Sequence, residues 1–599
     1  MSQQGTANGG DRPKVLIPEK VSPDGLKLLQ ASLDVHERKG LSPEELLDII
    51  GDYEALIVRS ETKVNAKLLQ AGKKLRVVAR AGVGVDNVDL ETATKLGVIV
   101  VNSPQGNINA AAEHTIALLM ATARNIGDAS VSIKSGKWER SKLTGVEVKG
   151  KTLAIVGLGK VGLTVARAAG GLGMNLIGYD PYANVNLAAA ANVEIVGTMD
   201  ELFEQADFLT IHTPMIASTK GMISTAELSK MKKTARVLNV ARGGIIDETA
   251  LLEALESQTI GGAGLDVFTS EPPQADDAAS KLIKHPKVVA TPHLGASTVE
   301  AQENVSIDVC EQVLSILSGQ LPRSAVNAPI IMAEEYRTLA PFVTLLERMG
   351  TLYTSYFGPS NSAQRLRTTF DLTYEGTLAS TKTTQPLFAA LVKGLVAPVT
   401  SQENTNINIV NAELIAKERG ILINESRARD RDIEGREGYS ASVTLRARLD
   451  PRSPSASRAP RQDPFKDAAG NRAKKLEDQI ISGFVSNNTP YISRLGRFAT
   501  SFVPEGVLLI LRNYDEPGKI GTVGGKLGKA GVNIRNMSVG PLDEGLRNNG
   551  NGGLSADATA NGKENEALMI LGVDRQVDEE VRKDLLGEDG VLEAASVTL

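Results

Sequence analysis

Cysteine is almost absent from this chain of 599 residues, which contains only Cys310. A single cysteine cannot form an intrachain disulfide, and it excludes a metal site built from several cysteine ligands. A strong charge of either sign is also lacking, because 66 Lys and Arg stand against 71 Asp and Glu and the formal net charge is −5. The charge balance therefore gives no sign of an overall nucleic-acid-binding surface.

Long apolar runs are lacking as well, since none approaches the roughly 20 residues that a membrane-spanning helix requires. The first dozen residues, 1–12, are polar and glycine-rich, unlike a secretory or transit peptide. Apolar residues nevertheless make up 42% of the chain, enough for buried cores. The length predicts about three to five domains. We therefore expect a soluble, cytosolic protein that binds neither nucleic acid nor a membrane.

A glycine turn between Gly157 and Gly162 is the most informative stretch of the sequence. The apolar run 152–156 leads into it, the helix-compatible run 163–172 leads out, and a second apolar run ends at Asp180. This order of strand, glycine turn, helix, strand and acid is typical of a dinucleotide-binding unit. A turn that merely reverses the chain is the alternative, but the complete context favours the binding unit.

Each glycine of this turn has a distinct physical role in a dinucleotide-binding site. Gly157 permits the tight turn, Gly159 lets backbone amides approach a pyrophosphate, and Gly162 lets the helix pack against the strand. Asp180 stands where an acid that binds the ribose hydroxyls is expected. No arginine follows Asp180 directly to bind a 2′-phosphate. The sequence therefore favours NAD over NADP.

Strands alternate with helices through residues 13–330, which predicts parallel α/β sheets. The expected strands are 15–18, 33–36, 55–59, 75–81, 98–101, 152–156, 174–179, 208–212, 236–241, 264–268 and 288–291. Long helices are expected at 109–124 and 299–318. We expect a Rossmann-type nucleotide domain at 106–300, inserted into a flavodoxin-like substrate-binding domain at 13–105 and 301–330. The active site should lie between them, outside the carboxyl ends of the strands.

The region 331–503 is less regular and is expected to form an α+β intervening domain. Helices are predicted at 339–357 and 387–396, and a strand at 366–374. The stretch 449–475 is basic and rich in Pro and Ser, so it is expected to be a disordered insertion or a solvated loop. Residues 461–476 are not assigned to any element.

The C-terminal region, 504–599, predicts a ferredoxin-like βαββαβ domain. The expected strands are 507–512, 532–539, 567–573 and 592–598, with helices at 520–530 and 578–586. The stretch 543–566 is rich in Gly and Asn and is expected to be a long flexible loop.

Among the five histidines, His293 is the strongest candidate for acid–base chemistry. It follows a predicted strand, where a side chain faces the proposed active site and can exchange a proton near neutral pH. His212 also ends a strand and is the second candidate, although it could simply cap that strand. His36, His114 and His285 are expected on the surface, on a helix and in a turn.

Two charged residues could complete this chemistry. Glu271 follows a strand and precedes two prolines. It could orient His293 and favour its protonated form, or be an ordinary turn acid. Arg242 follows the strand 236–241 and precedes two glycines. It could grip a carboxylate and polarise a carbonyl, or face solvent at a helix start.

Several segments together resemble the D-isomer-specific 2-hydroxyacid dehydrogenase family. The segments that carry this resemblance are 157–162, 242–244, 266–268, 271–273 and 292–297. Others are similar to the branch of the family that oxidises 3-phosphoglycerate, in its long form with an intervening domain and an ACT domain: 58–60, 80–87, 137–140, 293–298 and, more weakly, 412–421. The resemblance is strong over residues 13–330 and weaker beyond them.

The resemblance implies NAD-linked oxidation of 3-phospho-D-glycerate to 3-phosphohydroxypyruvate, the entry to L-serine biosynthesis. His293 would take the hydroxyl proton, Glu271 would orient His293, and Arg242 would hold the carboxylate and the developing carbonyl oxygen.

Binding positions also carry over from the family. The implied cofactor positions beside the turn glycines are Lys160, Val161, Asp180, Thr213, Val240, Arg242 and Asp266, the last holding the nicotinamide carboxamide. For the substrate, Arg59 and Arg80 would grip the phosphate, with Gly82, Val83 and Asn107 near the carboxylate.

The ACT-like domain implies regulation by an amino acid. Asp515 and Asn533 match the ligand-binding pattern of such domains, whereas Asn513 stands where the family more often has His or Tyr. Serine binding, or no ligand and a role in assembly, are both open. The family implies a homodimer through the nucleotide domains, with Arg140 reaching the partner's active site, or a homotetramer through the distal domains.

Two other functions are kept open. One is a different 2-hydroxyacid dehydrogenase, such as a glyoxylate or hydroxypyruvate reductase, which would have less use for both Arg59 and Arg80. The other is a dinucleotide-sensing corepressor that retains the fold and the Arg242, Glu271 and His293 set without a metabolic role.

Overall fold

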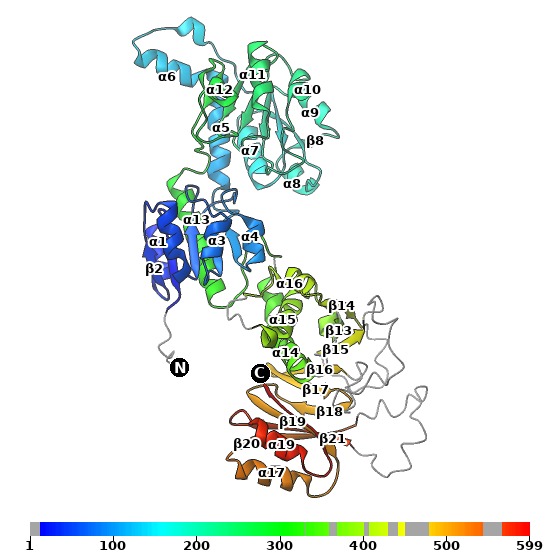
Figure 1. Ribbon diagram of the computed structural model, residues 1–599. Coiled ribbons are helices and arrows are strands. Elements are labelled where there is room, and N and C mark those ends of the chain that lie inside the picture. The colour runs from blue at the N-terminus through cyan, green and yellow to red at the C-terminus, as the bar shows by residue number, and fades with distance from the viewer. Residues whose placement is uncertain are drawn as a thin grey trace, which may run out of the picture.

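Four β-sheets form successive parts of an elongated molecule (Figure 1). The structure is a computed structural model, and it describes residues 12–329, 331–358, 368–400, 406–428, 441–449, 479–542 and 566–599. The chain starts in the first sheet, passes up into the second, returns, and then runs down through the third and fourth (Figure 1). Within the described residues no helix is long and apolar enough to cross a membrane.

The first sheet is parallel and has the strand order β2-β1-β3-β4-β5, as in flavodoxin-like folds. Its strands are β1 (Lys14–Ile17), β2 (Asp34–Glu37), β3 (Ala55–Val58), β4 (Val77–Arg80) and β5 (Ile99–Asn102). Its helices are α1 (Pro23–Gln30), α2 (Pro43–Ile49), α3 (Ala66–Ala71) and α4 (Leu90–Lys95). Local sequence starts these helices: Ser42 and Glu45, for example, form a reciprocal capping box at α2.

The second sheet is also parallel, in the order β12-β11-β10-β9-β6-β7-β8. Its strands are β6 (Thr152–Val156), β7 (Asn175–Tyr179), β8 (Glu194–Ile195), β9 (Phe208–Ile211), β10 (Arg236–Asn239), β11 (Gly262–Leu265) and β12 (Val288–Ala290). Its helices are α7 (Lys160–Gly171), α8 (Val185–Ala190), α9 (Met199–Gln205), α10 (Thr225–Ser229), α11 (Glu248–Glu256) and α12 (Ala278–Lys284). The strand order reverses between β6 and β9, which is where such sheets bind ligands.

Two long helices join these sheets. Helix α5 (Ile108–Arg124) places Leu118 and Leu119 in the core of the second sheet. Helix α13 (Val299–Leu317) places Val309 and the single cysteine, Cys310, in the core of the first. A third helix, α6 (Ile126–Lys134), projects to one side (Figure 1).

The third sheet is mixed, in the order β14-β13-β15-β16-β17-β18. Its strands are β13 (Thr368–Gly376), β14 (Leu422–Arg427), β15 (Ala441–Leu449), β16 (Ile480–Ser486), β17 (Thr489–Leu495) and β18 (Phe498–Phe502). Helices α14 (Ala333–Tyr356), α15 (Gln385–Val396) and α16 (Ala412–Glu418) accompany it. The sequence predicted one of these strands, β13. β14 is largely polar and shows little hydrophobic alternation.

The fourth sheet has the βαββαβ element order that the sequence predicts. Its elements are β19 (Val507–Tyr514), α17 (Lys519–Lys529), β20 (Ile534–Pro541), β21 (Glu566–Val573), α19 (Glu579–Leu586) and β22 (Val591–Thr598). The strand order is β20-β21-β19-β22. One face packs on α17 and α19 through Leu509, Leu511 and their neighbours.

Among the described residues, the other face of this fourth sheet packs into the core of the third sheet. Leu508, Ile510, Leu568, Ile570 and Val597 join the hydrophobic core of the third sheet and α14. The two sheets therefore share one continuous apolar core. The sequence had predicted two separate domains that meet at residue 503.

Two predicted boundaries need correction by one residue each. Leu449 ends β15, so the predicted insertion 449–475 cannot include it, and Glu566 begins β21, so the predicted loop 543–566 ends earlier. The remainder of both segments, and the unassigned stretch 461–476, lie outside the described residues.

Candidate active site

The glycine turn after β6 has the geometry that a dinucleotide needs. Gly157 has φ +94°, and a Cβ there would lie 2.6 Å from the carbonyl oxygen of His212. A Cβ at Gly162 would lie 2.1 Å from the Gly157 carbonyl oxygen, so α7 packs closely on the turn. Gly159 is the N-cap of α7 and has no side chain to bond the helix amides, and no heavy atom of the described residues lies within 4 Å of its Cβ position. The amides at this helix start are thus open to a phosphate.

The acid after β7 lies beside this turn. Asp180 Oδ2 accepts a hydrogen bond of 2.9 Å from the Leu158 amide, and Oδ1 accepts one of 2.8 Å from the Tyr182 amide. After β9, which pairs with β6 on the side away from β7, the Thr213 hydroxyl is buried without a hydrogen-bond partner in the described part of the chain. Lys160 is exposed, and Val240, after β10, is buried. These residues fit NAD, with Asp180 for the ribose and Thr213 offering an unused polar atom.

His293 and Glu271 form a hydrogen-bonded pair. His293 Nδ1 lies 2.6 Å from Glu271 Oε2, while the Phe268 amide donates to Glu271 Oε1 at 3.0 Å. The His293 backbone has φ 55°, which is unusual for a residue with a side chain, and its amide donates to the Asp266 carbonyl at 2.9 Å. The loops after β11 and β12 thus hold the pair that the sequence predicted.

The pair shifts both pKa values in the direction that keeps it charged. The hydrogen bond to Glu271 raises the pKa of His293 above its ordinary value, against a smaller opposing effect of burial. Burial alone would raise the pKa of Glu271, but the hydrogen bonds from His293 and the Phe268 amide outweigh it and lower that pKa. His293 is therefore a stronger proton acceptor than a free histidine.

Arg242 follows the adjacent strand β10. Asn239, 2% exposed, holds this turn: its side chain accepts from the Ala241 amide at 3.0 Å and donates to the Arg242 carbonyl at 2.9 Å. The Arg242 guanidinium reaches Asp86, which belongs to the loop after β4 in the first sheet, with Nε 3.3 Å from Oδ2. Asn239 and Asp86 were not identified from the sequence, although a polar residue that ends an apolar strand was a usable signal for Asn239.

Asp266 has a structural role that the sequence did not predict. Its fully buried carboxylate accepts hydrogen bonds from the Thr291 hydroxyl at 2.6 Å and from the amides of Leu294 and Gly295 at 2.7 and 2.8 Å. His114 Nε2 also lies 3.1 Å from Asp266 Oδ1. Burial would raise the pKa of Asp266, but these hydrogen bonds lower it on balance. The carboxylate therefore anchors the loop that carries His293.

The predicted phosphate residues lie at the carboxyl ends of neighbouring strands of the first sheet. Arg59 follows β3, and its loop is held by Glu19, which is 7% exposed and accepts from the Arg59 and Thr62 amides at 2.9 and 3.0 Å. The Asn87 side chain donates to the Arg59 carbonyl at 2.8 Å. These polar anchors were not identified from the sequence.

Arg80 ends β4, and its guanidinium is largely enclosed. Burial lowers the pKa of Arg80, the Arg242 charge adds to this, and Asp86 and Glu19 oppose it. Arg80 Nε is buried without a hydrogen-bond partner among the described residues. A buried cationic donor without a partner is costly unless a ligand completes it, so this position suits an anion.

The other predicted substrate residues lie on the loops beside Arg80. Gly82 is buried and Val83 is exposed, with the Val83 carbonyl accepting from the Asn102 side chain at 2.6 Å. Asn107 is the N-cap of α5, and in the part of the chain that the structure describes its side chain makes no capping hydrogen bond.

His212, the second candidate from the sequence, is not suited to act as a base. Burial lowers the pKa of His212 to about 4, and its Nε2 lies 3.0 Å from the Thr210 hydroxyl. It is therefore neutral and structurally engaged at neutral pH. His36 contacts Tyr53 at 2.8 Å, and His285 accepts from the Lys287 amide, so neither lies in this site.

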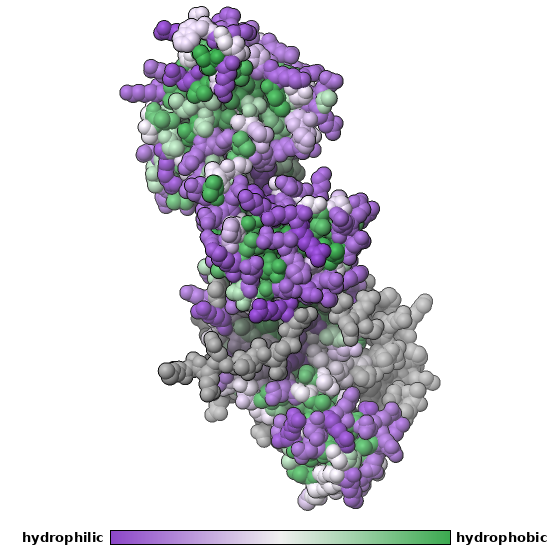
Figure 2. Space-filling model, turned by 90° about the vertical axis from the view of Figure 1, so that its left-hand side faces the viewer, coloured by the Kyte–Doolittle hydropathy of each residue, from purple (hydrophilic) through white to green (hydrophobic). Residues whose placement is uncertain are grey.

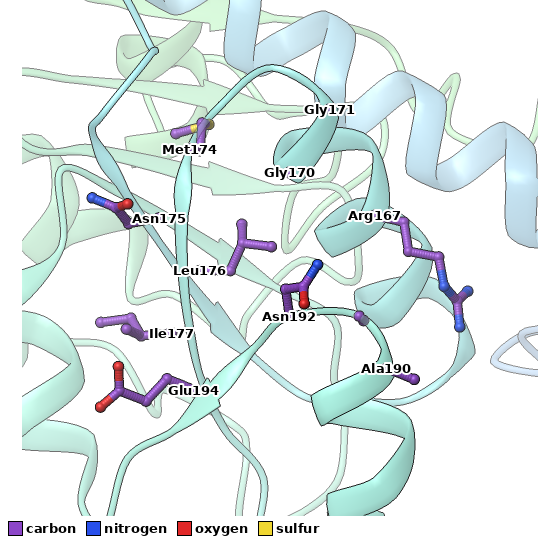
Figure 3. Close-up of a pocket in the computed structure, with 11 residues that line it drawn as sticks. Arg167, Gly170, Gly171, Met174, Asn175, Leu176, Ile177, Ala190, Asn192 and Glu194 are labelled. Atoms are coloured by element: carbon purple, nitrogen blue, oxygen red, sulfur yellow. The ribbon is translucent and has the colours of Figure 1, made fainter.

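A surface hollow elsewhere on the second sheet has no part in this arrangement. Figure 3 shows it between the C-terminal end of α7, the start of β7 and the end of α8, with Arg167, Asn175 and Glu194 in its lining. Because α7 runs from the carboxyl end of β6 to the amino end of β7, this hollow lies at the opposite edge of the sheet from His293.

The predicted regulatory residues lie on the fourth sheet. Asp515 follows β19 and Asn533 precedes β20; both are exposed, and the Asn533 amide donates to Asp574 at 3.0 Å. Asn513 is 4% exposed and donates to the Tyr514 carbonyl at 2.7 Å. It therefore lies inside the domain rather than beside the other two on the surface.

Comparison with known families identifies two segments. Residues 116–295 match the D-isomer specific 2-hydroxyacid dehydrogenase, NAD binding domain. Residues 338–456 match the D-3-phosphoglycerate dehydrogenase intervening domain. The first match covers the glycine turn, Arg242, Glu271 and His293.

Curated relatives match along almost the whole chain. The chloroplastic D-3-phosphoglycerate dehydrogenases 2 and 3 of Arabidopsis thaliana are 39% and 41% identical, over 97% and 96% of this chain and 86% and 90% of theirs. The D-3-phosphoglycerate dehydrogenase of Methanocaldococcus jannaschii is 37% identical over 98% of this chain and 100% of its own.

Proposed function

The chain belongs to the D-3-phosphoglycerate dehydrogenases, within the D-isomer-specific 2-hydroxyacid dehydrogenase family, and from this premise we propose that it oxidises 3-phospho-D-glycerate to 3-phosphohydroxypyruvate with NAD. This is the first step of the phosphorylated pathway to L-serine. The nucleotide domain is 106–300, the substrate-binding domain is 13–105 with 301–330, and the intervening and ACT-like domains follow at 331–503 and 504–599.

His293, Glu271 and Arg242 perform the chemistry. His293 Nε2 takes the proton of the C2 hydroxyl, because its Nδ1 is occupied by Glu271 at 2.6 Å. Glu271 fixes the ring and stabilises the imidazolium that forms. Arg242 grips the substrate carboxylate and polarises the developing carbonyl. The residues of the glycine turn would hold NAD, which would supply the acceptor for the C2 hydride.

The glycine turn and the residues after β7, β9 and β10 bind the cofactor. The amides at the start of α7 would hold the pyrophosphate, Asp180 would bind the ribose hydroxyls, and Thr213 would supply its hydroxyl, which has no hydrogen-bond partner among the described residues. Asp266 would accept a hydrogen bond from the nicotinamide carboxamide through Oδ2. Among the described residues, this oxygen accepts a hydrogen bond only from the Gly295 amide.

The substrate assignment rests on Arg80, whose buried Nε has no hydrogen-bond partner among the described residues. Arg59 follows β3, the strand beside β4, which ends at Arg80. A substrate with a second anionic group, the phosphate, makes use of both arginines. Gly82, Val83 and Asn107 surround the carboxylate. An unphosphorylated 2-hydroxy acid would leave one arginine unused.

The test is oxidation of NADH with 3-phosphohydroxypyruvate beside hydroxypyruvate, glyoxylate and 2-oxoglutarate, for wild type and Arg80→Ala. We expect the phosphorylated acid to be preferred by orders of magnitude in kcat/KM, and Arg80→Ala to remove most of that preference. Equal rates with the unphosphorylated acids would indicate a glyoxylate or hydroxypyruvate reductase. NADH binding without turnover of any acid would favour the corepressor-like alternative.

Serine regulation through the ACT-like domain is the second part of the proposal. Exposed Asp515 and Asn533 bind the amino acid, and the inward-facing Asn513 takes no part. Titration of activity and of binding with L-serine tests this. Absence of binding at millimolar serine would leave the domain with a role in assembly.

The assembly we propose is a dimer through the nucleotide domains, extended to a tetramer through the distal domains. Helix α6 and the residues after it expose a group of large apolar side chains: Ile126 (52%), Val131 (69%), Ile133 (53%) and Trp138 (82%). Figure 2, which looks at the side from which α6 projects, shows apolar residues over this upper part of the molecule. Arg140, just beyond them, reaches the partner's active site. Sedimentation velocity of wild type and Trp138→Ala tests the dimer.

A further inference from the structure

The proposed catalytic arginine makes an ion pair that bridges the two sheets. Arg242 belongs to the loop after β10 of the second sheet, and Asp86 to the loop after β4 of the first. Their side chains meet with Nε 3.3 Å from Oδ2. The Arg242 side chain is 30% exposed and the Asp86 side chain 72% exposed, so the pair stands at the junction of the units rather than in either core.

The contacts of the guanidinium are divided among its nitrogens. Nε faces Asp86, and Nη1 donates to the Ala241 carbonyl at 2.7 Å. Nη2 lies against Gly84, where a Cβ would approach it to 2.1 Å. Because a guanidinium is planar, contacts at Nε and Nη1 fix the plane and therefore the direction of Nη2.

Gly84 is needed here for space rather than for backbone freedom. Its φ is not among the positive values, so other residues could adopt its conformation. A Cβ would however lie 2.1 Å from Arg242 Nη2 and 2.7 Å from Asp86 Oδ2. The loop after β4 therefore needs glycine at position 84 to leave room for the ion pair between Arg242 and Asp86.

We propose that Asp86 is a positioning residue that holds Arg242 in the orientation required to grip and polarise the substrate. This inference rests on the proposed reaction and extends it, because Asp86 would act through Arg242, which it contacts, rather than on the reacting atoms. The negative charge of Asp86 also offsets the positive charges of Arg80 and Arg242, which converge on this loop.

Removal of Asp86 should therefore affect turnover more than binding. A loosened Arg242 no longer aligns with the developing carbonyl oxygen, and a misplacement of about 1 Å costs about 10²-fold in rate. The loss of a negative charge beside an anionic substrate favours binding, which compensates for the loosened grip. The signature is a lower kcat with little change in KM.

Steady-state kinetics with 3-phosphohydroxypyruvate and NADH should be measured for Asp86→Asn, Gly84→Ala, Arg242→Lys and the Asp86→Asn/Arg242→Lys double variant. Glu91→Gln is the matched control, because it removes an exposed ion pair with Lys95 in the same unit. We expect Asp86→Asn to lower kcat about 10- to 100-fold with KM changed less than about threefold. Gly84→Ala should lower kcat similarly with the charge of Asp86 intact. The double variant should be no slower than Arg242→Lys alone, and Glu91→Gln should match wild type.

An unchanged kcat in Asp86→Asn, or an effect of equal size in the Arg242→Lys background, would overturn the proposal. Oxamate, an unreactive analogue of a 2-oxo acid, separates this from the reaction assignment when its binding to the NADH-loaded protein is followed by NADH fluorescence. We expect Gly84→Ala and Arg242→Lys each to weaken oxamate about tenfold. If wild type reduces no 2-oxo acid while Gly84→Ala still weakens oxamate, the reaction is wrong and the placement of Arg242 by this loop stands. If wild type is active and Gly84→Ala binds oxamate as wild type does, while Arg242→Lys binds it more weakly, only the positioning role is wrong.

Discussion

The junction between the first and second sheets is polar, whereas the junction between the third and fourth sheets is apolar. The first and second sheets have separate hydrophobic cores, and charged side chains such as Arg242 and Asp86 meet between them. The third and fourth sheets share one core, to which Ile510 and Ile570 contribute from the fourth. At a polar junction, charged side chains can bind a ligand in place of one another at modest cost. Opening an apolar junction exposes hydrophobic surface to water, which is unfavourable. Chemistry therefore belongs at the first junction, and the second joins its two sheets into one body.

The largest expected effect is at the polar junction. His293→Asn removes the proton acceptor, so kcat should fall about 10²- to 10⁴-fold, the usual contribution of general acid–base catalysis. NADH affinity and the unfolding transition should stay as in wild type. Steady-state rates, NADH fluorescence titration and thermal unfolding measure the three quantities. A variant that keeps more than a tenth of the wild-type kcat would contradict the assignment of His293.

The apolar junction should respond in stability instead. Ile510→Ala leaves a cavity against the shared core and should cost about 2–5 kcal/mol in the unfolding of the distal half. Its matched control is Leu511→Ala, on the same strand but facing α17 and α19. Hydrogen exchange should rise in α14 for Ile510→Ala only, while kcat stays within about twofold for both. Equal exchange in α14 for the two variants would show that β19 does not transmit the change to one face.

The hydrogen bond between Glu271 and His293 predicts how the rate of oxidation depends on pH. Oxidation requires neutral His293, so kcat/KM should rise as pH increases through the His293 pKa. Since Glu271 raises that pKa, Glu271→Gln should move the acidic limb to lower pH, and it should lower kcat about 10- to 100-fold through lost orientation. The pH–rate profile of 3-phosphoglycerate oxidation measures both. A limb that stays in place, or moves to higher pH, is incompatible with this pair.

The smallest expected effect is at the contact between the first and third units. Asn406 and Asn408 both donate to the Gly97 carbonyl, at 2.8 and 2.7 Å. Asn408→Ala should cost about 1 kcal/mol in chemical unfolding, because Asn406 still satisfies this carbonyl. Activity should not change. A loss of activity with unchanged stability would mean that this contact influences the polar junction.

Residues at strand ends were predictable because local sequence encodes them. Arg242, Glu271 and His293 each follow an apolar run, and parallel strands carry such residues to one edge of the sheet. The partners that hold them were not predictable. His114 was expected on a helix, but its contact with Asp266, which joins that helix to a loop far along the chain, was not. Short-range patterns carry no information on such contacts.

The amino-acid sequence does contain a signal of the core shared by the third and fourth sheets. Leu508, Leu509, Ile510 and Leu511 form an unbroken apolar run, and all are at most 1% exposed. A strand covered on one face alternates, so an unbroken run indicates burial on both faces. What covers the second face could not be told from the run itself, because α14 precedes it by many residues.

The amino-acid sequence alone determined the glycine turn, the alternation of strands and helices, and the side chains that stand at strand ends. Each of these depends on neighbouring residues, through backbone sterics, capping and hydrophobic periodicity. The tertiary structure decided that Asp86 meets Arg242, that Asp266 anchors the His293 loop, and that the distal sheets share a core. These contacts join distant segments, and they form only when burial of whole faces brings the segments together.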